Sequence, residues 1–271
     1  MRAGRLAQRT YKTGRDRGWV FPAVMALLML TGWALWRQPG PEPALTVEPA
    51  PTLSPAESAP AERTLTLPGQ SWYALQIGVY DAAETAGRDA ESYRARGAGG
   101  YIFRKDGCRL LAAAYTARAD AQAVMSRLKT RHGLDTEVVE IVSPEITLRL
   151  SGQKGQLTAL TDAFSAMEKL CGHLYQLSLS LDRQETEAAE ALTALQSERD
   201  TLSVLSARLQ SRFGASAPAA VLGLKQILDD CVQSLTAAGA AKNLTQLGAQ
   251  VKYCHLECIC RMAAYASGLT N

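Results

Sequence analysis

WYALQIGVY at residues 72–80 is one copy of a strand pattern, and CRLLAAAY at residues 108–115 is the second copy. Side chains along a β-strand point alternately to the two faces of the sheet. In the first copy Leu75 and Ile77 therefore share an apolar face, and Gln76 lies on the other face. An internal repeat fixes the architecture of the segment that contains it. The pattern predicts two related units, with Gln76 directed toward solvent.

An Ala-rich helical pattern follows each copy, over residues 83–95 and residues 118–129. Asp81 is placed to cap the first of these helices, and glycines follow both. Further strands are predicted at 101–103 and 136–141, which completes the order β-α-β-β-α-β. This order predicts an α+β fold of the ferredoxin or RNP type, in which two helices cover one face of a four-stranded sheet and the other face is open.

Residues 71–142 resemble the SPOR (sporulation and cell-division related) domain. The first strand of that family reads roughly Tyr-x-Val-Gln-Val-Gly-Ser-Phe, and residues 73–80 are similar to it. The second family strand reads roughly Tyr-Arg-Val-x-Val-Gly-Pro-Phe. Here Arg109 and the terminal aromatic Tyr115 match, whereas Ala113 replaces the family's glycine.

The resemblance implies that the open sheet face binds septal peptidoglycan, on glycan strands that have lost their stem peptides. Gln76 matches the family's sheet-face glutamine, and aromatic rings such as Trp72 and Tyr73 suit stacking on sugars. Each of these residues also has an alternative interpretation without a binding role: Gln76 as a solvated strand residue, and Trp72 and Tyr73 as core or edge residues. The glycan-binding candidates are Gln76, Trp72, Tyr73, Val79, Arg109 and Leu111.

The N-terminal region predicts a membrane anchor. Residues 1–18 carry six basic side chains and one acidic one, and they read as a cytoplasmic tail. Residues 19–37 are apolar up to Arg37, long enough for a transmembrane helix, with tryptophans near both ends. This predicts a single-pass protein of the cell membrane, with the later domains on the extracytoplasmic side. A cleaved signal peptide is the alternative.

Residues 38–70 contain eight of the chain's eleven prolines. A segment of this composition cannot bury enough apolar surface to fold, and it favours an extended conformation. A Pro-rich, disordered linker is therefore predicted between the anchor and the SPOR-like domain.

Residues 146–271 form the last predicted domain, a helical bundle with coiled-coil-like seams. Apolar residues recur at helical spacing in four runs, over 157–181, 192–209, 221–235 and 244–265. The seams also allow a protein partner or self-association.

Cysteines occupy core-type positions in this domain, among them Cys171 and Cys231. Buried free cysteine behaves as a small apolar residue. Two alternatives stay open: disulfides, or a metal site that combines Cys254, Cys258 and Cys260 with His255. The spacing of these three cysteines matches no standard zinc motif.

No catalytic motif is present in the sequence, and its three histidines have no recognisable catalytic spacing. A catalytic pairing of Cys171 with His173 stays open as an alternative. The adjacent carboxylates Asp229 and Asp230 are interpreted as part of a solvated helix face. We expect no enzymatic activity, no cofactor, no metal and no nucleic-acid partner. The resemblance to the SPOR domain, together with the predicted anchor, implies a non-catalytic peptidoglycan-binding membrane protein that acts in cell division or sporulation. The alternative is a membrane-anchored interaction scaffold that acts through its C-terminal helices.

Overall fold

The computed structural model describes residues 60–105 and 107–270. The predicted basic tail (1–18), the predicted transmembrane segment (19–37) and the first part of the predicted linker lie outside these residues.

The predicted location, a single-pass membrane protein with a cytoplasmic N-terminus, is corrected by the structure. Within the described residues, no helix combines the length and the apolar character needed to cross a membrane. Segment 19–37, on which the prediction depended, is not among those residues.

A four-stranded antiparallel sheet and two helices form the first part of the fold, and the predicted α+β class is confirmed. The spatial order of the strands is β3-β4-β2-β5. The elements follow the predicted order: β2 (Gln70–Tyr80), α3 (Ala83–Arg94), β3 (Tyr101–Arg104), β4 (Cys108–Tyr115), α4 (Arg118–His132) and β5 (Glu137–Ser143).

Of the cap residues predicted for these two helices, one is confirmed and one is wrong. Helix α4 ends at Gly133, whose φ of 62° suits glycine, as predicted. At the start of α3 the prediction is wrong, because Ala82 rather than Asp81 is the N-cap residue and no side chain caps the helix. Tyr80 instead ties α3 to β2 by donating a 2.7 Å hydrogen bond to Asp89.

Strands β1 (Pro60–Leu67) and β6 (Ile146–Gln153) pair antiparallel in a separate two-stranded sheet. The linker prediction is therefore wrong for residues 60–67. Leu65 and Leu67 alternate with polar residues and pack against the core. Proline lacks the backbone N–H that a strand interior needs. Pro60 is the first residue of β1 and Pro68 lies just after it, so both positions tolerate proline.

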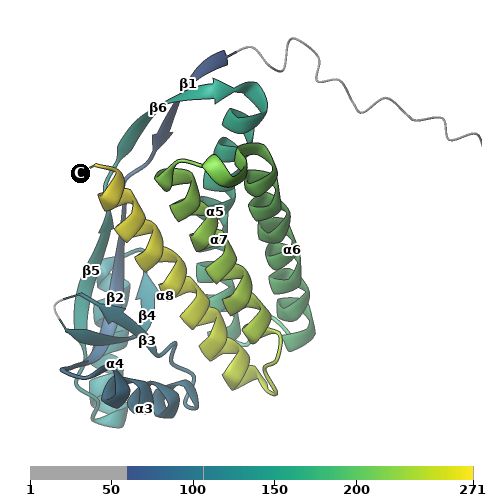
Figure 1. Ribbon diagram of the computed structural model, residues 1–271. Coiled ribbons are helices and arrows are strands. Elements are labelled where there is room, and N and C mark those ends of the chain that lie inside the picture. Colours follow the sequence, from purple (N-terminus) through teal and green to yellow (C-terminus); the bar gives the residue numbers. More distant parts are fainter. Residues whose placement is uncertain (1–59, 106, 271) are drawn as a thin grey trace, which may run out of the picture. The chain divides into compact units, whose positions relative to one another are not determined.

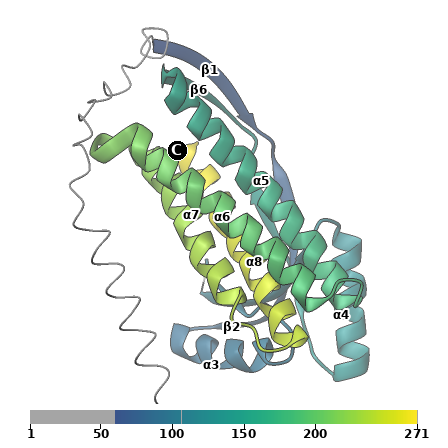
Figure 2. The same ribbon diagram turned by 90° about the vertical axis from the view of Figure 1, so that its right-hand side faces the viewer.

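Four long helices follow, as the four apolar runs predict (Figure 2). A short 3-10 turn, η1 (Gly214–Ser216), separates the second from the third. Asn243 caps the last helix by accepting a 2.9 Å hydrogen bond from the backbone N–H of Gln246. The helices are α5 (Lys154–Asp182), α6 (Ala188–Phe213), α7 (Ala219–Ala238) and α8 (Leu244–Leu269).

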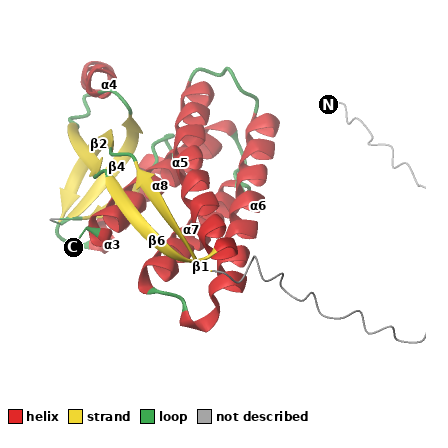
Figure 3. Cartoon of the chain, turned by 90° about the horizontal axis from the view of Figure 1, so that it is seen from above, coloured by secondary structure: helices red, strands yellow, loops and turns green. Residues whose placement is uncertain are grey.

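Helix α8 covers the sheet face that the sequence predicts to be open (Figures 1 and 3). It contacts β3, β4 and β5 on one side and α5 and α7 on the other. At Gly99 the approach is close, because a Cβ atom there would lie only 2.9 Å from Cδ1 of Leu256. The segments predicted as separate domains, 71–142 and 146–271, thus contribute to one continuous core.

Candidate functional site

Three side chains from adjacent strands form a polar row across the sheet. Gln76 of β2 donates a 3.0 Å hydrogen bond from Nε2 to Oε2 of Glu137 on β5. Arg109 of β4 donates from Nη1 to Oε1 of Gln76 at 2.9 Å, and from Nε to the carbonyl oxygen of Lys105 at 3.1 Å. Both polar atoms of the Gln76 amide are therefore engaged inside the protein.

The prediction that Gln76 points to solvent is wrong, because its side chain is only 5% exposed. The reason is its place on β2, which lies between β4 and β5 in the sheet whose face α8 covers. The hydrogen bonds from Arg109 and to Glu137 offset the cost of burying the amide. The role of Gln76 in glycan binding stays a prediction.

The other glycan-binding candidates do not share one surface. Trp72 is buried, with its ring centroid 5.5 Å from that of Tyr175, so its alternative reading as core is correct. Leu111 is fully buried and Tyr73 is half-buried, whereas Val79 is 53% exposed. The structure therefore brings together Gln76 and Arg109 and leaves Val79 at the surface.

A groove of about 450 Å³ lies between the sheet and the last turns of α8. Ligand pockets of small molecules usually measure about 300–1,000 Å³. We call it the sheet groove. Its lining residues are Phe103, Arg104, Lys105 and Arg109 from the β3–β4 hairpin, Val139, Glu140, Ile141 and Val142 from β5, and Cys260, Ala263, Ala264 and Ser267 from α8.

The sheet groove is cationic and has one aromatic side chain. Arg104, Lys105 and Arg109 face one acidic lining residue, Glu140. Phe103 lies opposite Arg109 in the register of β3 and β4, so the ring and the guanidinium belong to the same face of the sheet. Such a groove offers hydrogen-bond donors beside an apolar ring.

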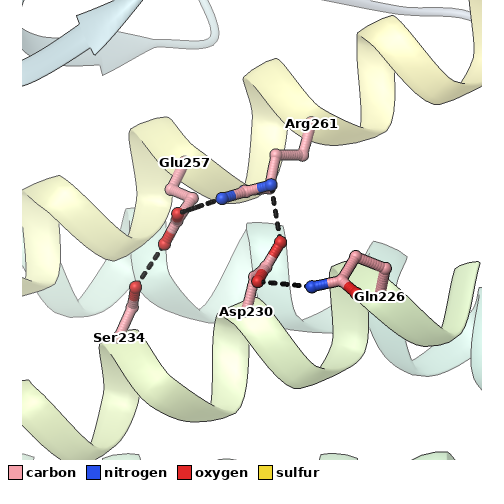
Figure 4. Close-up of polar contacts among 5 residues, drawn as sticks. All are labelled: Gln226, Asp230, Ser234, Glu257 and Arg261. Atoms are coloured by element: carbon pink, nitrogen blue, oxygen red, sulfur yellow. Dashed lines mark hydrogen bonds and ion pairs between the residues drawn. The ribbon is translucent and has the colours of Figure 1, made fainter. Parts of the chain in front are cut away.

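An ionic network that is buried at Glu257 and partly exposed at Arg261 fixes α8 against α7 (Figure 4). Glu257 is 5% exposed and accepts hydrogen bonds from Ser234 and from Arg261. Arg261 also forms an ion pair with Asp230 at 2.6 Å, and Asp230 accepts a 2.9 Å hydrogen bond from Gln226. Arg261 is the one cation between two carboxylates, and the neutral donors Ser234 and Gln226 supply the remaining hydrogen bonds that buried carboxylates require.

This network corrects the reading of Asp229-Asp230 as a solvated face. Asp229 pairs with Lys225 at 2.6 Å and accepts a hydrogen bond from Ser206, while Asp230 binds Arg261 on α8. The two carboxylates thus connect α7 to different helices. Because the side chain of Arg261 is tied to α7, the neighbouring turn of α8 that lines the sheet groove is held in position.

Two tyrosines join the network to the sheet. Tyr101 of β3 and Tyr253 of α8 meet edge to face, with centroids 5.5 Å apart. Burial raises the pKa of Tyr101 above its usual range, and the neighbouring Cys260 and Glu257 raise it further. Both rings therefore stay neutral near pH 7 and serve as packing contacts between β3 and α8.

All six cysteines of the chain are free thiols, and five are buried. Contacts with the thiols of Cys171 and Cys231 raise the pKa of Cys258 well above its usual value, and burial raises it further. Among the residues that the structure describes, no group of His, Cys, Asp and Glu side chains could hold a metal ion. The core-packing reading of these cysteines agrees with their burial.

The formally open pairing of Cys171 with His173 does not form a nucleophile–base pair. Cys171 is buried in the core, whereas His173 is exposed and its Nδ1 lies 2.6 Å from Oε1 of Glu198 on α6. A nucleophile and its base must lie within hydrogen-bond reach of each other. These two residues instead belong to different sides of α5.

No family model matches the chain, and neither a curated protein nor a solved structure matches it.

Proposed function

We propose that this protein is a non-catalytic, SPOR-like carbohydrate-binding protein that docks on peptidoglycan glycan strands lacking stem peptides, and that the sheet groove is where it binds them. The observation that carries the proposal is the groove itself, a cationic recess with an aromatic wall on the face where the resemblance places the glycan. The strand motif around Gln76 supports the same assignment.

The chemistry of the groove suits the proposed ligand. Removal of a stem peptide leaves a free carboxylate on the lactyl group of the sugar, so a denuded strand is an anion with many hydroxyl groups. Arg104, Lys105 and Arg109 offer N–H donors for both kinds of group. Phe103 offers an apolar ring for the C–H face of a sugar.

The sequence suggests that Gln76 contacts the glycan, whereas in this proposal it positions another residue. Its amide is occupied by Arg109 and Glu137, so it does not contact sugar hydroxyls. It positions the guanidinium of Arg109 at the edge of the groove. We therefore treat Arg109 as the contact residue and Gln76 as its positioning residue.

The scaffold alternative has less support. The seam residues that would bind a partner helix, such as Leu202, Leu224 and Leu228, are buried in the core of this chain. Seams that are filled internally are not free to pair with another helix.

A co-sedimentation assay tests the proposal on the full-length protein. We expect it to pellet with cell walls stripped of stem peptides by an amidase, and less with untreated walls. Arg109→Gln should weaken this binding roughly tenfold, as expected for a lost charged hydrogen bond. Arg88→Gln, on the exposed side of α3, is the matched control and should bind normally. Failure of the wild-type protein to pellet with stripped walls would contradict the proposed function.

A further inference from the structure

A second recess, of about 440 Å³, lies between α4 and the C-terminal end of α5. We call it the α4–α5 cleft. It shares no lining residue with the sheet groove. Its lining residues are Tyr115, Asp120, Ala123, Val124, Arg127, Leu128, Arg131 and His132 on one side, and Tyr175, Leu179, Asp182 and Arg183 on the other.

Two tyrosines form the floor of the cleft. Tyr115 and Tyr175 line the recess and are only 8% and 7% exposed. Burial raises the pKa of Tyr115 to about 12, with Asp182 adding to the rise and Arg127 opposing it. The Tyr115 hydroxyl therefore lies within electrostatic reach of charges from both helices and keeps its proton, as a hydrogen-bond donor, at neutral pH.

The rim of the cleft is cationic. Arg127 and Arg131 are one helical turn apart on α4, and neither forms an ion pair with any residue in the described part of the chain. Lys129, between them in sequence, pairs with Asp135 at 3.0 Å instead. Of the two acidic lining residues, Asp182 pairs with Lys252 at 2.6 Å, and Asp120 offsets one of the two arginines, so the remaining charge of the rim is positive.

Apolar side chains line the recess between floor and rim. Val124 and Leu128 of α4 lie on one wall, and Leu179 of α5 lies on the other. Walls of this kind favour the flat or apolar face of a ring, and paired guanidiniums favour a planar or tetrahedral oxyanion. The volume of the cleft lies within the range that is usual for small-molecule pockets.

We infer that the α4–α5 cleft binds a small cyclic organic anion, a sugar-sized ring that carries a carboxylate or a phosphate. The anionic group lies between Arg127 and Arg131, and the ring lies between the apolar walls above Tyr115. This site is independent of the proposed glycan site, because the two recesses have no residue in common.

Isothermal titration calorimetry on the full-length protein tests this inference with four probes: glucuronate, glucose 6-phosphate, glucose and inorganic phosphate. We expect one or both cyclic anions to bind at least tenfold more tightly than glucose and than inorganic phosphate. The tighter of the two anions identifies the acidic group. Equal binding of glucose, or phosphate binding as tight as that of glucose 6-phosphate, overturns the inference, as does an absence of binding by both cyclic anions.

Substitutions on α4 locate the binding. The double variant Arg127→Gln/Arg131→Gln should lose at least tenfold in affinity for the cyclic anion while its melting temperature stays near that of the wild type, because both side chains are exposed. Lys129→Gln lies on the same helix and is the matched control, with unchanged affinity expected. Wild-type affinity in the double variant overturns the assignment of the site.

Discussion

The indole of Trp72 lies against the imidazole of His255, with ring centroids 4.7 Å apart and an angle of 76° between the ring planes. Trp72 belongs to the central strand β2, and His255 belongs to α8. Tyr175 of α5 contacts both rings. These three side chains join the sheet to the helices, so the sheet face is an internal surface and not an open platform.

His255 should make the protein sensitive to acid. Burial lowers its pKa from 6.5 to about 3, so the unfolded state takes up a proton before the folded state does. Stability is therefore lost as pH falls below about 6.5, by up to about 1.4 kcal/mol per pH unit. In His255→Phe this contribution should vanish. Denaturant unfolding of both proteins at pH 7, 6 and 5 measures the difference.

The exposed His132 provides the control for this experiment. His132→Gln should keep the pH dependence of the wild type. A His255→Phe variant with the same pH dependence as the wild type would show that His255 is not buried as the structure has it.

Breaking the network between α7 and α8 should be costly. Arg261→Met leaves the buried carboxylate of Glu257 without its cation, and we expect a loss of about 3 kcal/mol in the free energy of unfolding. Adding Glu257→Gln should recover part of this loss, because it removes the unpaired charge and keeps a partner for Ser234. Denaturant unfolding of the wild type, both single variants and the double variant measures the coupling.

The exposed pair of Arg208 and Asp162 is the control for the network, because both side chains are more than 40% exposed. Arg208→Met should cost less than about 1 kcal/mol. Additive effects of the two network substitutions would argue against a direct contact between Glu257 and Arg261.

Cys108 should be the only cysteine that reacts quickly in the native protein. The other five are buried, and burial raises the pKa of Cys254 and Cys260 so that little reactive thiolate is present. Mass spectrometry after brief iodoacetamide treatment should find one modified residue in the native protein and six after denaturation. Fast labelling of Cys254 or Cys258 would mean that α8 separates readily from the core.

Gln76→Leu should change both stability and binding. The substitution leaves Arg109 and Glu137 without their shared partner, and we expect a loss of about 1–3 kcal/mol in the free energy of unfolding. Glycan binding should weaken because Arg109 is no longer positioned. Val79→Ser on the same strand is the control for stability: its exposed position predicts no change in the free energy of unfolding. A Gln76→Leu variant as stable as the wild type would contradict the hydrogen-bonded row.

Much of the fold follows from sequence periodicity. The alternation in residues 72–80 predicts β2, and the 3–4 spacing of apolar residues predicts all four long helices. Strand β1 is missed because prolines dominate the composition of 38–70, although Leu65 and Leu67 already alternate with threonines. Its pairing with β6 joins segments far apart in the chain, which local patterns do not reveal.

The position of α8 is the main feature that the sequence analysis misses, although a signal was present. One stripe, including Val251 and Cys258, predicts an amphipathic helix. Leu256 and Ile259 lie off that stripe and are also buried. A helix that is apolar on more than one side packs between two layers, and the second layer here is the sheet.

The candidate site could be predicted only in part, because the strand motif does not show that α8 covers the sheet. The strand motif identifies both residues as candidates. Gln76 lies in its first copy, on β2, and Arg109 lies in its second copy, on the adjacent strand β4. The strand pattern directs Gln76 toward solvent because polar side chains usually face water, yet Gln76 is buried and its amide oxygen accepts a hydrogen bond from Arg109. Ala264 and Cys260 complete the groove from the far end of the chain.

Blocking the sheet groove is the most direct test of the proposed glycan site. Ala264 of α8 is exposed and lines the groove, so Ala264→Trp fills it without entering the core. Ala207→Trp, on the exposed side of α6, is the matched control. Co-sedimentation with peptide-free glycan strands should fall at least tenfold for Ala264→Trp and stay at the wild-type level for Ala207→Trp. Binding of Ala264→Trp at the wild-type level would contradict the assignment of the glycan to this groove.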